Sequence, residues 1–343
     1  MDSTNHVNSN KITINDVADA LGVSKTTVSR AISGKGRIGN ETRTRVLNYI
    51  SEHNYSPNVI AKGLATSRTY NIGFVIPGDY RIIDIPFFQK CLFSISETAS
   101  ELDYDVIVST INGNDISHLE RLITNHKVDG IILARTVEND PSIRYLLENH
   151  VPFVTLGTTD EEGVVQIDND HFNACVELTS LLLLKGITNL GLIGGSKNHV
   201  VNHKRYDGYI KAHEKLDRTV NYENIYLDVN NMAGIDRAVD DLLEHGVHCI
   251  ICMDDSICHH VLNKLSRDHM LVPQDVKIAS FYDSALMEIN SISNTAITSI
   301  KFDIQEMGST ACQTLINLIE GRKVKPIQLL GYNIILKAST QSV

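Results

Sequence analysis

A short segment near the start of the chain places polar and basic side chains on one arc of a predicted helix: Lys25, Thr26, Ser29, Arg30 and Ser33. Val28 and Ala31 point to the opposite side, as expected for a helix that buries one face. Arginine can donate two hydrogen bonds to a guanine edge, and serine and threonine hydroxyls can reach phosphates or bases. The spacing therefore predicts a helix that contacts the major groove of DNA.

The elements before this helix are those needed to position it. Apolar residues recur at i, i+3, i+4 and i+7 in a first helix, at Ile14, Val17, Ala18 and Leu21. Gly22 permits a tight turn, and Ser24 is a good N-cap for the second helix. Two helices joined in this way are typical of a helix-turn-helix. A solvated three-helix bundle with no ligand is the alternative, but the turn, the caps and the segregated face agree with one another.

A third helix is predicted from about Glu41 to His53, with Val46, Leu47 and Ile50 buried. The loop before it is rich in glycine and basic residues. Arg37 in this loop can contact a phosphate or a base edge, or remain a solvated loop charge.

The net charge of −10 is unevenly divided along the chain. Residues 1–68 contain nine Lys/Arg and five Asp/Glu, whereas the remainder contains 22 and 36. Positive charge is therefore concentrated in the segment that is predicted to meet phosphates. The excess of +4 indicates weak, salt-sensitive binding by a single module, which a homodimer would double.

The length of 343 residues is sufficient for two or three domains. Six scattered cysteines, with no signal peptide and no long apolar run, predict a cytoplasmic protein. After Tyr70, short apolar runs alternate with helix-length segments. The predicted strands are Asn71–Ile76, Tyr104–Thr110, Gly130–Leu133, Pro152–Leu156, Leu190–Ile193, Asn224–Leu227, Cys249–Met253 and Val276–Phe281. This alternation predicts two α/β subdomains with mostly parallel sheets, whose ligands bind beyond the carboxyl ends of the strands.

Two sequence segments resemble the lactose-repressor and galactose-repressor family of bacterial transcription regulators: VADALGVSKTTVSRAISG and TRTRVLNYISEHNYSPNVIAKGLATSRTYNIGFVIP. The resemblance is specific over residues 12–77 and looser to the C-terminus. It implies an all-α helix-turn-helix module at 1–57, a hinge helix and linker at 58–69, and an effector-binding and dimerisation core at 70–343. The core would comprise two doubly wound parallel-sheet subdomains related to periplasmic sugar-binding proteins. We expect subdomain one at about 70–167 and 297–325, and subdomain two at about 168–296 and 326–343.

The predicted DNA-contacting residues are Thr13, Lys25, Thr26, Thr27, Ser29, Arg30, Arg37, Asn58 and Leu64. Pro57 stops the preceding helix, and Asn58 can cap a short helix over 59–65. Leu64 matches the leucine of the family's hinge helix, which is inserted between bases of the minor groove. Packing within the linker is the alternative role for Leu64.

The resemblance also implies an effector site made of Phe87, Phe88, Arg205, Asp254, Tyr282 and Asp283. Phe88 would stack on a sugar face or else pack into the core, and Arg205 would bond hydroxyls or a carboxylate or else form a surface salt bridge. Asp254 matches a ligand-bonding position, and Asp255 is a candidate cap for the following helix. Gly157 and Tyr282 stand where relatives often carry acidic residues, so no relative's ligand can be assigned to this chain.

The sequence contains no GxSxG, HExxH, P-loop or GxGxxG-after-strand pattern, so we expect no enzyme and no cofactor. A zinc site at Cys249 and Cys252 is disfavoured, because residues three apart in a strand point to opposite faces. The principal hypothesis is a repressor of carbohydrate-utilisation genes that binds a pseudo-palindromic operator as a homodimer. A sugar-like effector would control it through the angle between subdomains. The alternatives are a regulator that depends on a corepressor or partner protein, and a cytoplasmic sugar-binding protein with a vestigial DNA module.

Overall fold

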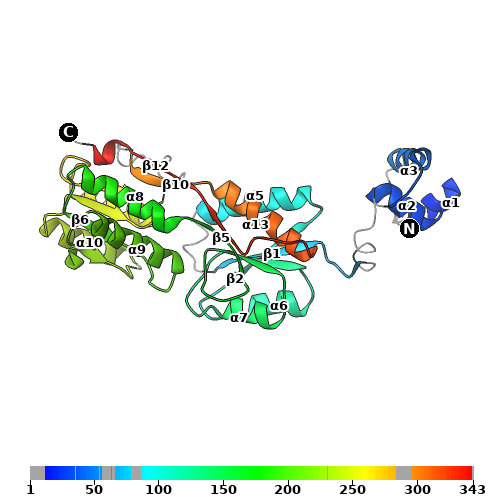
Figure 1. The fold of residues 1–343 in the computed structure, drawn as a ribbon, viewed down its shortest axis with the longest axis horizontal. Helices are drawn as coiled ribbons and strands as arrows, with labels where there is room; N and C mark the ends of the chain where they lie inside the picture. The colour runs from blue at the N-terminus through cyan, green and yellow to red at the C-terminus, as the bar shows by residue number, and fades with distance from the viewer. Residues whose placement is uncertain are drawn as a thin grey trace, which may run out of the picture. The chain divides into compact units, whose positions relative to one another are not determined.

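A computed structural model describes residues 12–34, 36–53, 55, 63, 66–78, 86–229, 231–282 and 296–341. The chain divides into two compact units, Met1–Thr69 and Tyr70–Val343 (Figure 1). The second unit begins at the residue where the sequence pattern changes from helical to strand–loop–helix. None of the helices in the described ranges is long and apolar enough to cross a membrane.

The first unit contains the helices α1 (Ile14–Leu21), α2 (Lys25–Ser33) and α3 (Asn40–Glu52). Their core is formed by small and β-branched residues that are at most 3% exposed, namely Val17, Ala18, Val28, Ala31 and Val46. Leu47 is 41% exposed, so its predicted burial is wrong. The buried stripe of α3 instead continues through Tyr49 and Ile50, which lie one turn beyond Val46 and pack on the core.

The second unit contains two sheets. The strands of the first sheet are β1 (Asn71–Pro77), β2 (Asp105–Ile111), β3 (Gly130–Leu133), β4 (Phe153–Leu156), β5 (Val165–Asn169) and β11 (Ile327–Leu330), in the order β11-β5-β4-β3-β1-β2. The strands of the second sheet are β6 (Leu190–Ile193), β7 (Ile225–Tyr226), β8 (Cys249–Cys252), β9 (Lys277–Ser280), β10 (Thr298–Phe302) and β12 (Tyr332–Ile335), in the order β12-β10-β9-β8-β6-β7. All pairs are parallel except β10 with β12.

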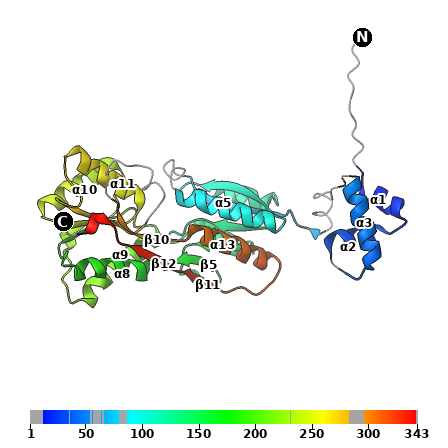
Figure 2. The ribbon, with the colours of Figure 1, turned by 90° about the horizontal axis from the view of Figure 1, so that it is seen from above.

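Helices cover both sheets and define two lobes. The first lobe carries α5 (Pro86–Glu101), α6 (Ser117–Thr124), α7 (Pro141–Glu148) and α13 (Ile304–Ile319). The second carries α8 (His171–Leu184), α9 (Val200–Lys215), α10 (Met232–Glu244) and α11 (Asp255–Arg267), with the short 3-10 helices η1 (Tyr222–Asn224) and η2 (Ala338–Thr340). The helices α5 and α13 lie side by side, as do α8 and α9 (Figures 1 and 2). The predicted fold class of two doubly wound subdomains is confirmed.

Two strands lie in a different lobe from the one that the predicted subdomain boundaries gave them. The segment 298–302 forms β10 in the second sheet, where it pairs with β9, although it was expected in subdomain one. The segment 327–330 forms β11 in the first sheet, where it pairs with β5, although it was expected in subdomain two. The described chain therefore passes between the lobes after β5, after β10 and after β11. Non-local strand pairing decides these positions: β11 pairs with a strand about 160 residues earlier, and β10 with one about 20 residues earlier.

Candidate DNA-binding surface and effector cleft

The helix α2 has the two faces that its sequence predicts. Lys25, Thr26, Ser29 and Arg30 are exposed, whereas Val28 and Ala31 are fully buried. Ser24 caps the helix, because its Oγ accepts a hydrogen bond from the backbone N–H of Thr27 at 3.1 Å. The hydroxyls of Ser24 and Thr27 are also 2.9 Å apart, and Thr27 is half-buried. Of the predicted contact residues on α2, Thr27 is thus the one already engaged within the helix.

Thr13, just before α1, and Arg37, in the loop between α2 and α3, are both exposed. Thr13 forms a capping box with Asp16: its backbone N–H and its hydroxyl each donate to the Asp16 carboxylate at 2.7 Å. The same hydrogen bonds lower the pKa of Asp16. Arg45 fixes α3 to the end of α1, since its Nη2 donates to the carbonyl of Leu21 at 3.2 Å. The capping box fixes the start of α1, and the Arg45 hydrogen bond joins α3 to the end of α1, so both neighbours of α2 are held in position.

The side chain of Arg30 lies along the loop that follows α2. A Cβ atom at Gly36 would be 3.2 Å from Cδ of Arg30, and Gly36 has a φ of +95°. A side chain at position 36 would therefore strain the backbone and crowd Arg30. Asn58 and Leu64, the predicted hinge contacts, lie outside the described residues.

In the second unit, aromatic rings from both lobes meet. Phe87, in the first turn of α5, contacts Phe88 with ring centroids 5.1 Å apart and Tyr282 with centroids 6.3 Å apart. Tyr282 follows β9 of the second lobe and is 5% exposed. It stacks in turn on Phe302 at the end of β10, at 6.3 Å. The ring that faces the second lobe is thus Phe87, whereas the sequence analysis placed Phe88 first.

The second lobe also contains buried charged groups. Arg205 projects from α9 and is 8% exposed, and no hydrogen bond reaches its Nε. Burial raises the pKa of Asp254, and the nearby Arg205 opposes this shift. Asp254 is the N-cap of α11, because its Oδ1 accepts from the N–H of Ile257 at 2.8 Å. The sequence analysis offered this capping role to Asp255, which instead begins the helix and is 4% exposed. Asp283 lies outside the described residues.

Sequence reasoning missed Asp168 and His171. Asp168 lies near the end of β5 and is 3% exposed, and its Oδ1 is 3.5 Å from Nε2 of His171 at the start of α8. Burial raises the pKa of Asp168 to about 6, against the opposing effect of nearby Lys204 and Arg205. The pKa of His171 is held well below its usual value by burial and by the same two cations. The run Asp168-Asn169-Asp170-His171 after an apolar pair was the available signal, but Val165–Asn169 was not recognised as a strand.

A second contact joins the lobes, which we call the lobe clasp: the loop Thr136–Glu138 of the first lobe, and Asn198–Val200 with His203 of the second. Val137 and His199 form an antiparallel β-bridge. The N–H of Glu138 donates to the carbonyl of Asn198 at 3.2 Å, and that of Val200 to the carbonyl of Thr136 at 3.3 Å. The Glu138 carboxylate is 3.4 Å from Nδ1 of His203. The clasp holds the two lobes together through backbone and side-chain bonds.

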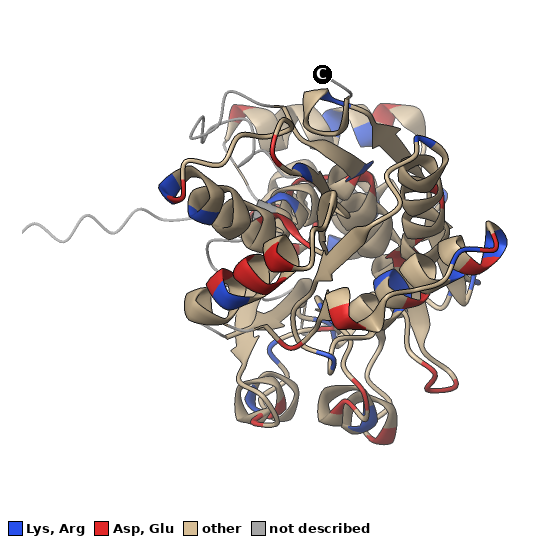
Figure 3. Ribbon diagram, turned by 90° about the vertical axis from the view of Figure 1, so that its left-hand side faces the viewer, with Lys and Arg blue, Asp and Glu red and all other residues tan. Residues whose placement is uncertain are grey.

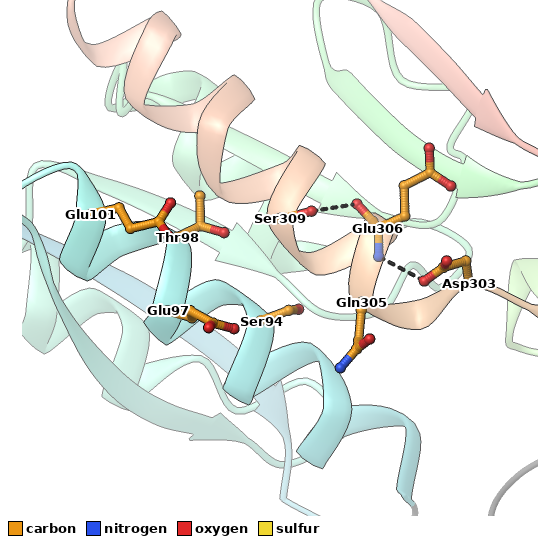
Figure 4. Close-up of a pocket in the computed structure, with 8 residues that line it drawn as sticks. All are labelled: Ser94, Glu97, Thr98, Glu101, Asp303, Gln305, Glu306 and Ser309. Carbon is orange, nitrogen blue, oxygen red and sulfur yellow. Dashed lines mark hydrogen bonds between the residues drawn. The ribbon is translucent and has the colours of Figure 1, made fainter.

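Two hollows in the described surface lie elsewhere. One, of about 300 Å³, lies between α5 and α13 and is lined by the carboxylates Glu97, Glu101, Asp303 and Glu306 with smaller polar residues (Figure 4). The other, of about 650 Å³, is lined by α9 residues His203, Tyr206 and Asp207 and by the η1–β7 segment. His203 and Asp207 are two residues from Arg205 on either side, and so lie on the opposite side of α9. Along the ribbon of the second lobe, acidic and basic residues are interleaved (Figure 3).

No group of three or more His, Cys, Asp or Glu side chains within the described ranges could hold a metal ion. Cys249 and Cys252 are fully buried, and they belong to different apolar clusters. This agrees with thiols on opposite faces of β8. Burial also raises the pKa of both thiols, which keeps them protonated and poorly reactive.

Each of the two units matches a known protein family. Residues 13–58 match the family model described as bacterial regulatory proteins, lacI family, and residues 69–334 match that of periplasmic binding proteins and sugar binding domain of LacI family. The HTH-type transcriptional regulator MalR of Streptococcus pneumoniae is 32% identical over 345 residues, which cover 95% of this chain and 99% of MalR.

Two solved structures share the fold across nearly the whole chain. One is a transcriptional regulator CelR–cellobiose complex, with a TM-score of 0.72 and 24% identity. The other is the lac repressor dimer bound to operator and the anti-inducer ONPF, with a TM-score of 0.77 and 20% identity. Each alignment covers 96% of this chain and 99% of the other. With its two family-model matches and its similarity to MalR along its length, the chain belongs to the LacI family of bacterial regulatory proteins.

Proposed function

We propose that this protein is a sequence-specific repressor of carbohydrate-utilisation genes, and that a sugar-like effector in the cleft between its lobes controls its affinity for an operator. One observation carries the proposal. The same chain presents an exposed polar face on a capped helix α2 and, in a separate unit, buried charged and aromatic residues between two lobes. The names of the relatives agree with this division, since solved structures include a probable maltose operon transcriptional repressor and a transcriptional regulator in complex with cellobiose.

On the DNA side, Arg30 is the residue that reads a base. Its guanidinium can donate two hydrogen bonds to a guanine in the major groove. Thr26 and Ser29 are placed to reach bases or phosphates, and Lys25, Thr13 and Arg37 to neutralise or bond phosphates. A homodimer would set two such helices in successive major grooves of a pseudo-palindrome, with Asn58 and Leu64 acting in the intervening hinge.

On the effector side, Phe87 and Tyr282 supply aromatic faces, and Arg205 and Asp254 supply a hydrogen-bond donor and an acceptor. Because the groups come from both lobes, an effector that contacts all of them favours one angle between the lobes over another. Such a ligand shifts the population that can bind the operator only by its difference in affinity for the two states. The acceptor role of Asp254 is compatible with capping, since a carboxylate accepts more than one bond.

The test begins with selection of bound duplexes from a random DNA library by the full-length protein in the cytoplasmic range of salt. We expect a pseudo-palindromic sequence whose affinity exceeds that of a scrambled duplex by at least about 10³-fold. Maltose, cellobiose and glucose are then titrated into the complex, and release of the operator by at least one of them is expected. Binding that is equal for every sequence would refute the regulator assignment. A sugar that instead tightens operator binding would replace release by corepression.

Asp254→Asn and Lys264→Ala serve as a matched pair in this assay. Asparagine keeps the cap of α11 but removes the charge from the cleft. Lys264 lies on the same helix, where its ammonium pairs with Asp240 and Asp268. We expect the sugar response to be lost in the first variant and kept in the second, with operator affinity unchanged in both.

A further inference from the structure

A hollow of about 650 Å³ on the second lobe is separate from the proposed effector residues. It lies between α9 and the segment formed by η1 and β7. His203, Tyr206 and Asp207 line it from α9, where they are three and four residues apart and so share one face of the helix. Arg205 lies on the opposite side of α9 and is 8% exposed. A molecule in this hollow therefore contacts residues that the effector proposal does not use.

Three tyrosines from three different elements line the hollow: Tyr206 on α9, Tyr222 in η1 and Tyr226 in β7. The ring of Tyr226 is held in place, because its hydroxyl donates to the Asp241 carboxylate at 3.1 Å. Tyr222 is 65% exposed. None of the ring contacts in the described part of the chain involves any of these three tyrosines. The hollow thus offers aromatic surface that no other described ring covers, and such surface can pack on a ligand.

The basic side chains of the lining are already engaged. The N–H of Lys197 donates to Oδ1 of Asp228 at 2.7 Å, and its ammonium is 3.2 Å from Oδ2 of the same carboxylate. The bond from this N–H lowers the pKa of Asp228, which keeps the carboxylate ionised. His203 faces the carbonyl of Lys197 with Nε2 and the Glu138 carboxylate with Nδ1. An anionic ligand would therefore have to displace a carboxylate to reach either base.

Asp207 is the acidic residue that lines the hollow without such a partner. Within the described ranges, no ion pair or hydrogen bond reaches its exposed carboxylate. When the partners of Lys197 and His203 are included, three carboxylates stand against one lysine and one histidine. A carboxylate beside tyrosine rings attracts a cation, because the face of an aromatic ring is the negative part of its quadrupole. The charges and the rings of the hollow therefore favour the same kind of ligand.

We infer that this hollow is a second ligand site and that it takes an organic ammonium ion, whose charge Asp207 balances and whose carbon substituents pack on the three tyrosine rings. The site is distinct from the effector cleft, and the inference goes beyond the proposed control by a sugar. His203 joins the hollow to the lobe clasp, since the same imidazole contacts Glu138 of the first lobe. The ligand would therefore lie next to a contact between the lobes.

The test compares two cations with neutral molecules of nearly the same shape: choline with dimethylbutanol, and putrescine with butanediol. Calorimetric titration uses the full-length protein at pH 7.5 in about 0.15 M NaCl, which screens the general attraction of cations to an acidic surface. We expect saturable binding of at least one cation, at least about tenfold tighter than that of its neutral counterpart. Equal binding within both pairs, or no saturable binding of either cation below about 50 mM, overturns the inference.

Asp207→Asn removes the charge with little change in shape and should weaken binding of the cation about fivefold. Asp217→Asn is the matched control, because Asp217 is an exposed aspartate just beyond the end of α9. Its φ is +51°, a conformation that asparagine adopts as readily as aspartate, so this substitution adds no backbone strain. Its effect on the affinity should be less than about twofold. Equal effects of the two substitutions would assign the attraction to net charge and overturn the site.

Tyr222 tests the aromatic part of the site. Tyr222→Leu should weaken binding of the cation about three- to fivefold, whereas Tyr222→Phe keeps the ring and should stay within about twofold of the native protein. Because this side chain is 65% exposed, neither substitution should unfold the lobe. If the leucine variant binds the cation as tightly as the native protein does, the ring makes no contact with the ligand and its assigned role is refuted.

Asp254→Asn distinguishes the hollow from the effector cleft. It removes a carboxylate of the cleft and keeps the cap of α11. The affinity for the cation should remain within about twofold of the native value. A loss of binding in this variant, with none in Asp207→Asn, would place the cation in the cleft and overturn the inference.

Discussion

Two arginines carry the proposed functions of the two units, and their surroundings are opposite. Arg30 on α2 is exposed, and its aliphatic part rests on Gly36. Arg205 on α9 is 8% exposed and lies among carboxylates. Removing an exposed charge has little effect on folding, whereas removing a buried one leaves its partners unbalanced. The exposed Arg30 is therefore free to contact a binding partner, whereas the charge of the buried Arg205 is balanced by charged groups within the protein.

The largest effect is expected for Arg205→Ala. It removes the buried guanidinium near Asp168 and Asp254, and removing one member of a buried set of charges costs about 3–5 kcal/mol. Urea denaturation of the full-length protein at pH 7.5 measures this loss. Lys211→Ala on the same helix removes an exposed ion pair with Glu214; it is the control and should cost less than about 1 kcal/mol. If Arg205→Ala is as stable as the native protein, the guanidinium does not balance these carboxylates.

The next largest effect has the opposite sign. The pKa of Asp168 is raised from 3.8 to about 6 on folding, so the ionised carboxylate disfavours the folded state above pH 6 and has no such effect below about pH 4. A shift of about two units corresponds to about 3 kcal/mol. The stability of Asp168→Asn relative to the native protein should therefore be about 2–3 kcal/mol more favourable at pH 8 than at pH 4. The hydrogen bond that the asparagine amide cannot accept from Thr158 or Asn169 lowers stability equally at both pH values. An equal change at both pH values would assign the effect to packing.

Arg30→Ala should separate binding from stability. We expect a loss of about 1–3 kcal/mol in operator affinity, with relaxed preference at one base pair and an unchanged urea midpoint. Electrophoretic mobility-shift titration against the selected operator and its single-base variants measures both changes. A uniform loss across all sequences would instead assign Arg30 to a phosphate.

The smallest effect is expected for Thr13→Ala, which removes the capping box of α1. Loss of an N-cap typically costs about 1 kcal/mol, and here it falls on the helix that supports α2. Hydrogen exchange of the α1 amides should increase while that of the sheets in the second unit stays constant. Thr13→Ser keeps the cap and should behave as the native chain; a change in exchange with serine would point to the methyl group.

Much of the fold was predictable because short apolar runs in the sequence indicate the buried strands. Runs such as Gly130–Leu133 and Cys249–Cys252 are apolar and four residues long, and they form buried strands where expected. The strand Val165–Asn169 was missed because it carries Gln, Asp and Asn among its five residues. Those polar residues are buried near the crossing between lobes, where Asp168 lies 3.5 Å from His171. A pattern search for apolar strands passes over a strand whose polar residues serve a site.

The candidate sites also include features that the sequence predicts and features that it does not. The exposed face of α2 follows from helical periodicity, and Arg205 and Asp254 follow from a family resemblance. The pairing of β11 with β5 does not, since it joins residues about 160 positions apart in sequence. Nor did the sequence decide which of two adjacent aspartates would cap α11, because either can accept the bond and only the packing of the loop selects Asp254.

The lobe clasp has a consequence for timing. If release of the proposed effector requires the lobes to separate, the bridge between Val137 and His199 must open first, and the clasp would then affect the residence time of the effector as well as its affinity. A regulator with a slow release step keeps its occupied state for some time after the surrounding ligand has been consumed. Through the bonds between Glu138, Asn198 and His203, the protein would then respond to the recent average of its ligand's concentration and filter out brief fluctuations.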